Sequence, residues 1–196
     1  MWNTSSYQND WTPNQEALLK TWYDKARVYA WLHAQSHAYF KKLNYAFAIP
    51  CILLSTFSGS ANFMLSGGGE DDGPSATTSM TLGVVNLFTA MLMSTNQFLK
   101  LAESADRHKT LSVGYGKFVR NVNAQLSLDS ADREPGIQFV MSCQKDIDGL
   151  IEQSPDIPEN VLKRFHREFD HDASMTLPDI VGRAGDEAEP RVSVAI

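Results

Sequence analysis

Residues 44–69 read NYAFAIPCILLSTFSGSANFMLSGGG, and no Asp, Glu, Lys or Arg occurs between Lys42 and Glu70. A helix needs roughly 20 consecutive, mostly apolar residues to cross the hydrocarbon core of a bilayer, and this stretch is longer than that. The stretch therefore predicts a membrane-spanning helix at residues 44–65.

A second charge-free stretch follows at residues 73–99, which read GPSATTSMTLGVVNLFTAMLMSTNQFL and lie between Asp72 and Lys100. It predicts a second spanning helix at residues 80–99. The alternative is two buried helices of a soluble bundle, because Ser, Thr, Asn and Gly make both stretches only moderately apolar. Two long charge-free stretches in succession are rare in soluble domains, which favours the membrane.

The charges that flank the two predicted spans predict their orientation. Basic residues border the spans on their outer flanks: Lys41, Lys42, Lys100, Arg107 and Lys109. The Gly-rich loop between the spans, residues 66–79, contains acidic residues and no basic one. Because basic residues are retained in the cytoplasm, we expect both termini to be cytoplasmic and the acidic loop to lie on the other side. Residues 1–10 lack the apolar core of a signal peptide, so the first span would act as its own signal.

The N-terminal flank has the pattern of one amphipathic helix. After an N-terminal arm at residues 1–12, Thr12 and Gln15 can form a capping box around a helix that starts at Pro13. Apolar and aromatic side chains then recur every three or four residues up to residue 43. The repeating positions are Leu18, Trp22, Ala26, Tyr29, His33, His37 and Phe40.

Residues 100–169 are predicted to form further cytoplasmic helices. The first should continue without a break from the second span over residues 98–126. Its expected buried stripe is Leu101, Ala105, His108, Leu111 or Ser112, Tyr115, Phe118 and Val122. A helix after Pro135 should bury Ile137, Val140, Cys143 or Gln144, Ile147 and Ile151, and a short helix from Pro158 should bury Val161, Leu162, Phe165 and Phe169.

Residues 170–196 are rich in Asp, Glu, Gly and Pro, which predicts a disordered tail. The expected architecture is all-α. A two-helix transmembrane hairpin carries a cytoplasmic helical bundle that is built from both flanks.

The composition argues against several classes of function. The net charge of −6 is unfavourable for a nucleic-acid binder that neutralises phosphates. No phosphate-binding loop, zinc-protease or nucleophile-elbow motif occurs, and neither span contains an ionisable Asp, Glu, Lys, Arg or His. We therefore expect no enzymatic activity, no cofactor and no metal.

Three smaller features have ordinary structural explanations. His33 and His37 have metal-ligand spacing, but no Cys or carboxylate lies one turn away, so packing or hydrogen bonding is the better explanation. Cys51 and Cys143 lie on different elements and are expected to be free thiols. The pair Gly114 and Gly116 is expected where another helix approaches closely.

Small and polar side chains form a stripe along each span. The stripes consist of Ser55, Ser58, Gly59 and Asn62 in the first span, and of Asn86, Thr89 or Ala90, Met93 and Asn96 or Gln97 in the second. Unpaired polar groups are costly in lipid, so these stripes must meet protein or water. Two interpretations stay open: close packing within the hairpin and between subunits, or a water-filled pore made by several subunits. Pro50 removes one backbone donor and should kink the first span.

Part of the chain resembles a known family. The residues concerned are Trp22…Ala26…Tyr29…Trp31-Leu32-His33…Ser36…Tyr39, then Asn44…Ile49-Pro50-x-Ile52-Leu53-Leu54-Ser55-Thr56-x-x-Gly59-x-Ala61-Asn62-Phe63. They resemble the SLATT proteins, which are two-transmembrane effector domains of nucleotide-sensing conflict systems. The later pieces Leu101-x-Glu103-Ser104 and Leu150-Ile151-Glu152-x-Ser154-Pro155-x-Ile157-Pro158…Phe165 look like a viral and algal branch.

The resemblance extends over about Trp22 to Phe169 and implies a membrane effector that forms pores or perturbs membranes. It implies no catalytic residue. By position, Pro50, Ser55, Gly59 and Asn62 match the membrane motif of the family. The leading hypothesis is thus a homo-oligomeric pore-forming or membrane-perturbing protein in a lipid bilayer. The alternative is a structural membrane anchor or scaffold that binds a protein partner through its cytoplasmic helices.

Overall fold

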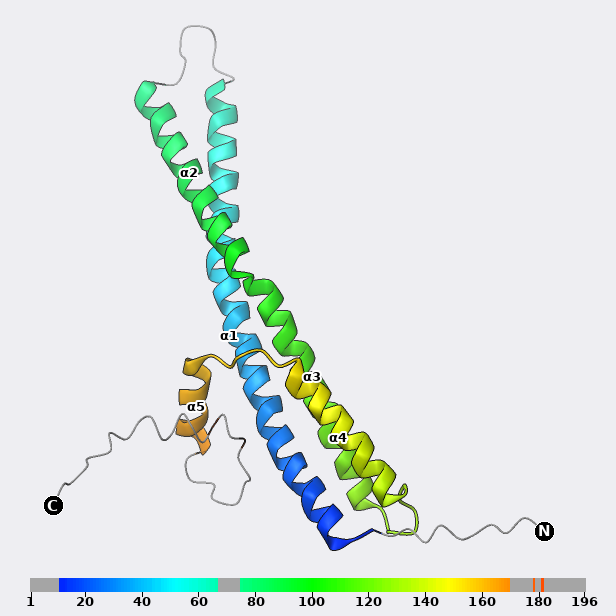
Figure 1. Cartoon of the computed structure of the whole chain (residues 1–196). Coiled ribbons are helices and arrows are strands. Elements are labelled where there is room, and N and C mark those ends of the chain that lie inside the picture. Colours follow the sequence, from blue (N-terminus) through cyan, green and yellow to red (C-terminus); the bar gives the residue numbers. More distant parts are fainter. Residues whose placement is uncertain (1–10, 67–74, 170–177, 179–180, 182–196) are drawn as a thin grey trace, which may run out of the picture. The chain divides into compact units, whose positions relative to one another are not determined.

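The computed structural model describes residues 11–66 and 75–169 together with Pro178 and Val181. Within these residues it contains helices and no strand (Figure 1). The helices are α1 (Pro13–Ser66), α2 (Ala76–Leu99), α3 (Leu101–Ser127), α4 (Gly136–Glu152) and α5 (Glu159–Phe169). The all-α prediction is confirmed. The predictions for residues 1–10, for most of the acidic loop and for nearly all of the tail fall outside the described residues.

The described residues belong to two compact units. We call residues 38–105 the hairpin unit, and the remaining described residues, before residue 38 and after residue 105, the helical unit. Helix α1 contributes to both units, because it runs without interruption from Pro13 through Pro50 to Ser66. The predicted capping box at its start is confirmed: the Gln15 N–H donates to Thr12 Oγ1 (3.3 Å), and the Thr12 N–H donates to Gln15 Oε1 (2.9 Å).

The prediction of one continuous helix over residues 98–126 is wrong, because the helix is interrupted at one residue. Lys100 has a left-handed backbone (φ 47°, ψ 40°) and separates α2 from α3. Its N–H donates to the Gln97 carbonyl at 3.2 Å, which is the kind of contact that closes the C-terminal end of a helix. This break coincides with the predicted end of the second span. Helix α2 begins at Ala76, earlier than predicted, because the Ser75 hydroxyl caps it by accepting from the Thr78 N–H.

The core of the helical unit lies among α1, α3 and α4. Its buried residues are Leu19 and Ala26 of α1, Leu111, Tyr115, Phe118 and Val122 of α3, and Phe139, Cys143 and Ile147 of α4. The predicted stripe of α3 is confirmed over its whole length, since Leu101, Ala105 and His108 are buried as well. Of the pair of glycines, Gly114 meets the expectation: an added Cβ there would lie 2.7 Å from Leu150 Cδ2. Gly116 does not, because its nearest such neighbour is a side-chain nitrogen of Arg120 in the same helix.

The predicted buried face of α4 is partly wrong. Ile137 is 65% exposed and Ile151 is 48% exposed, whereas Phe139 is buried. The buried positions recur every four residues from Phe139, through Cys143 to Ile147. Ile137 lies two residues before Phe139, which places it on the opposite side of the helix.

A second cluster holds α5 against α1. Trp31 of α1 makes T-shaped ring contacts with Phe165 and Phe169 of α5, with ring centroids 5.5 and 5.4 Å apart. The Arg164 guanidinium also donates a hydrogen bond to Gln35 Oε1 at 3.0 Å. The buried members of the cluster are Val28, Leu32, Ile157, Val161, Phe165 and Val181. The predicted short helix after Pro158 is therefore confirmed.

Candidate functional site in the hairpin unit

The hairpin unit exposes its apolar side chains. Phe57 is 73% exposed, Phe63 82% and Leu87 74%. Both α1 and the helix that starts at Ala76 contain a segment long and apolar enough to cross a membrane, and only 11% and 6% of these segments are buried inside the structure. The core helix of a soluble protein would be mostly buried, so the exposed apolar surface argues against that alternative.

Two polar contacts join α1 to α2. The Ser58 hydroxyl donates to Asn86 Oδ1 at 2.7 Å, and Ser58 is almost fully buried. Two turns earlier in α1, Cys51 Sγ lies 4.0 Å from the carbonyl oxygen of Thr89. The Thr89 hydroxyl donates within its own helix, to the Val85 carbonyl. Within a single chain, these contacts therefore provide hydrogen-bond partners for some of the polar side chains in the two stripes.

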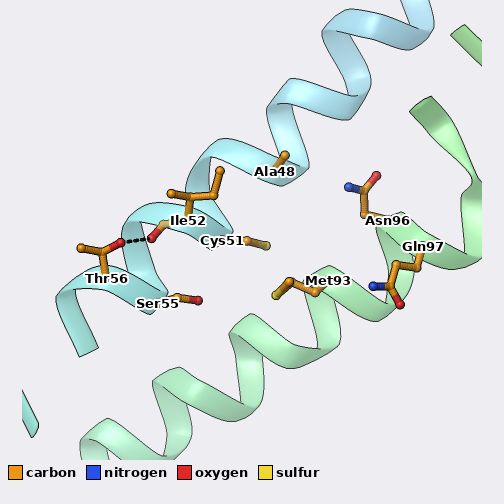
Figure 2. A pocket seen from close by; sticks show the side chains of 8 residues that line it. All are labelled: Ala48, Cys51, Ile52, Ser55, Thr56, Met93, Asn96 and Gln97. Carbon is orange, nitrogen blue, oxygen red and sulfur yellow. Dashed lines mark hydrogen bonds between the residues drawn. The ribbon is translucent and has the colours of Figure 1, made fainter. Parts of the chain in front are cut away.

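A groove of about 460 Å³ opens between the same two helices (Figure 2). Cys51, Ser55 and Met93 point toward the space between the helices, and Asn96 and Gln97 lie at one end of it. The lining residues are Ala48, Cys51, Ile52, Ser55, Thr56, Met93, Asn96 and Gln97.

One buried polar atom of the residues that line this groove has no hydrogen-bond partner within the described residues. Asn96 Oδ1 is buried and accepts no hydrogen bond within the described part of the chain. The Thr56 hydroxyl, by contrast, donates to the Ile52 carbonyl of its own helix at 2.8 Å. A buried carbonyl oxygen without a donor costs about 1–3 kcal/mol, so the groove contains a site that a donor from outside the chain would stabilise.

The structure divides the predicted polar stripes among three places. Ser58, Asn86 and Thr89 lie at the contact between the helices, and Ser55, Met93 and Asn96 line the groove. Gly59, Asn62 and Ala90 lie at exposed positions.

Gly59 has open space around it within the chain, because no atom lies within 4 Å of an added Cβ. Ser58, and not its neighbour Gly59, is the residue that points at α2. Sequence reasoning also missed four lining residues, which are Ala48, Cys51, Ile52 and Thr56. For Cys51 the available signal was spacing, because it lies two helical turns before Ser58.

The helical unit contains the other residues that the sequence singled out. His33 is hydrogen-bonded to His108, which confirms the structural explanation given for it. Burial raises the pKa of the Cys143 thiol to about 12, so this cysteine is protonated and unreactive at neutral pH. Among the described residues, no group of three or more His, Cys, Asp and Glu side chains is arranged to hold a metal ion.

The class that these observations define is an all-α protein with an apolar two-helix unit, a polar groove in that unit, and a separate helical unit. No protein-family model, curated protein or solved structure matches the chain.

Proposed function

We propose that this protein is an integral membrane protein, similar to the SLATT effectors, whose hairpin crosses the bilayer with both termini in the cytoplasm. Several copies associate through the polar faces of their hairpins and form a pore or a membrane-perturbing assembly. The observation that supports this most is the combination of an apolar exterior with a polar groove that contains the unpartnered Asn96 carbonyl.

The apolar exterior supports insertion. Removing a large apolar side chain from water is worth about 1.5–3 kcal/mol, and the hairpin unit exposes many such side chains. At the end of the apolar segment nearest the N-terminus, the Lys41 ammonium lies 5.9 Å from the centre of the Tyr45 ring. Basic and aromatic side chains are favoured together at the boundary between lipid and water.

The groove supports association. In hydrocarbon, Asn96 Oδ1 requires a donor, which could come from a second subunit or from water. Two helices per chain cannot enclose a pore, so several subunits are required. Gly59 is exposed one turn from Ser55, and a small-x-x-x-small pair of this kind allows a neighbouring helix to approach closely.

The scaffold alternative is favoured by the Ser58–Asn86 hydrogen bond, because a scaffold needs its polar groups paired inside the protein.

Conductance distinguishes the two functions. We expect purified full-length protein in planar bilayers to give stepwise currents, and we expect Asn96→Leu to reduce them strongly. Thr95→Leu is the matched control, because Thr95 is exposed and its hydroxyl is satisfied by the Met91 carbonyl of its own helix. An electrically tight bilayer that contains inserted protein would favour the scaffold and refute the pore.

The same proposal predicts that Gly59→Leu reduces the size of the assembly, because a leucine side chain would hold the neighbouring subunit away. Cross-linking and mass measurement of the protein in nanodiscs would show the change. Gly83→Leu is the control, since Gly83 also has open space around it but lies on α2, outside the Ser55–Gly59 pair. An unchanged oligomer size in Gly59→Leu would show that subunits do not meet at this face.

A further inference from the structure

Two histidines from α1 and α3 form a buried pair in the helical unit. His33 is 0% exposed and His108 is 1% exposed. Their Nδ1 atoms lie 2.8 Å apart, which is a hydrogen-bond distance, and their ring centroids are 5.0 Å apart. One Nδ1 must therefore donate and the other must accept. The second nitrogen of His33, Nε2, is buried and has no partner among the described residues.

The surroundings of the pair are aromatic. The His33 ring stacks on Tyr115 of α3 with centroids 5.6 Å apart, and lies 6.5 Å from Tyr29 of α1. Burial raises the pKa of Tyr115 to about 12, so this phenol is uncharged at neutral and acid pH. His37 of α1 also acts on the pair, because a positive charge on its ring opposes protonation of His108. Arg107 and Lys109, on either side of His108 in α3, are exposed.

We propose that the His33–His108 pair is a proton-operated switch that releases α1 from α3 in the helical unit. When both rings carry a proton, neither Nδ1 can accept, and the hydrogen bond between the helices is lost. Two positive charges then face each other in a site that water does not reach. The packed arrangement of α1 and α3 is stable only while at least one ring is neutral.

The direction of the pH effect follows from the pKa shifts. Burial, and then the charge of His108, lower the pKa of His33 from 6.5 to about 4, and burial also lowers the pKa of His108. The open form, in which the rings are solvated, therefore binds protons at a higher pH than the packed form. Stability that is present above pH 6.5 is lost progressively as the pH falls toward 4. The switch would operate whether or not the hairpin forms a pore, because both histidines lie in the helical unit.

Hydrogen exchange of the full-length protein in nanodiscs tests the switch. We expect the protection factors of amides at residues 106–118, corrected for the intrinsic pH dependence of exchange, to fall by about tenfold or more from pH 7.5 to pH 5.0. Amides at residues 80–95 of the hairpin unit serve as the internal reference and should keep their protection. Equal protection of residues 106–118 at the two pH values would overturn the proposal.

A variant and a control identify the groups that titrate. The double variant His33→Asn/His108→Asn retains a donor and an acceptor at each site but cannot be protonated, so we expect its protection to be the same at both pH values. His166→Asn removes a histidine from α5 and should respond to pH as the unmodified protein does. A response that persists in the double variant, or that disappears in His166→Asn, would contradict the proposal.

A second measurement serves even if the double variant does not fold. The ¹⁵N signals of the histidine rings in the unmodified protein report protonation directly. We expect the pair to become doubly protonated over the same pH range in which residues 106–118 lose protection. Double protonation with α3 still protected would overturn the switch.

Discussion

Replacing Tyr115 with alanine should lower the free energy of unfolding of the helical unit by about 3–5 kcal/mol, which is the range for large aromatic-to-alanine changes in a core. Tyr115 is fully buried, and its ring stacks on Tyr29 with centroids 5.2 Å apart and on His33. Its hydroxyl is hydrogen-bonded to Ser154 Oγ at 3.0 Å. One side chain of α3 thus contacts α1 and the segment that follows α4, so its loss leaves a cavity and unpaired groups together.

Tryptophan fluorescence during urea unfolding of the full-length protein in detergent measures this effect. Trp11, Trp22 and Trp31 belong to the helical unit, and no tryptophan occurs in the sequence of residues 38–105, so the signal does not report on the hairpin unit. Tyr115→Phe keeps the ring and should cost only about 1 kcal/mol, the usual worth of one hydrogen bond. Val113→Ala, at a half-exposed position of the same helix, should cost less still. An alanine variant no less stable than the phenylalanine variant would show that the ring is not part of the core.

Replacing Leu87 with arginine should largely prevent the hairpin from inserting into membranes. Leu87 is 74% exposed and lies near the middle of α2. An arginine at the centre of a spanning helix costs about 2.5–3.5 kcal/mol relative to water, and it replaces a leucine that favours insertion. Together these effects correspond to a shift of more than about a hundredfold in the insertion equilibrium.

The control for Leu87→Arg is the same change at the end of the helix. Met80 is 72% exposed near the start of α2, where a long basic side chain can reach the lipid headgroups. Met80→Arg should therefore retain most of the insertion. The measurement is the fraction of protein that resists extraction by alkaline carbonate. Equal retention of Leu87→Arg and of the unmodified protein would show that Leu87 does not face lipid at the middle of a span.

Periodicity predicted the helices and most of the core. The stripe from Leu101 to Val122 is buried as expected, and the capping box at Thr12 closes as its residues predict. Periodicity failed at two places: the left-handed residue Lys100, which ends α2, and the choice of the buried face of α4. No residue type near Lys100 marks the left-handed turn, since this conformation is commonest for glycine. In α4, Ile137 and Phe139 are both apolar, and only packing against α1 and α3 selects Phe139.

Residue type singled out the polar side chains of the hairpin unit, but it did not indicate which of them contact α2, which line the groove and which are exposed. Helical spacing placed Ser55, Ser58 and Gly59 in one stripe, because a helix turns by about 100° per residue and neighbouring faces overlap. Which of them meets α2 depends on the rotation of α1 about its own axis, and sequence spacing does not contain that angle. The structure assigns Ser58 to the contact, Ser55 to the groove and Gly59 to the outside.

The central claim is that the hairpin crosses the bilayer and places the acidic loop opposite both termini. Labelling of single cysteines in sealed vesicles by a membrane-impermeant thiol reagent tests it most directly. In a background with Cys51→Ser and Cys143→Ser, the variants Glu70→Cys and Asp129→Cys report on the loop and on the helical unit. In vesicles with their cytoplasmic side outward, we predict that Asp129→Cys is labelled at once and Glu70→Cys only after detergent is added. Equal labelling of both cysteines in intact vesicles would contradict the account.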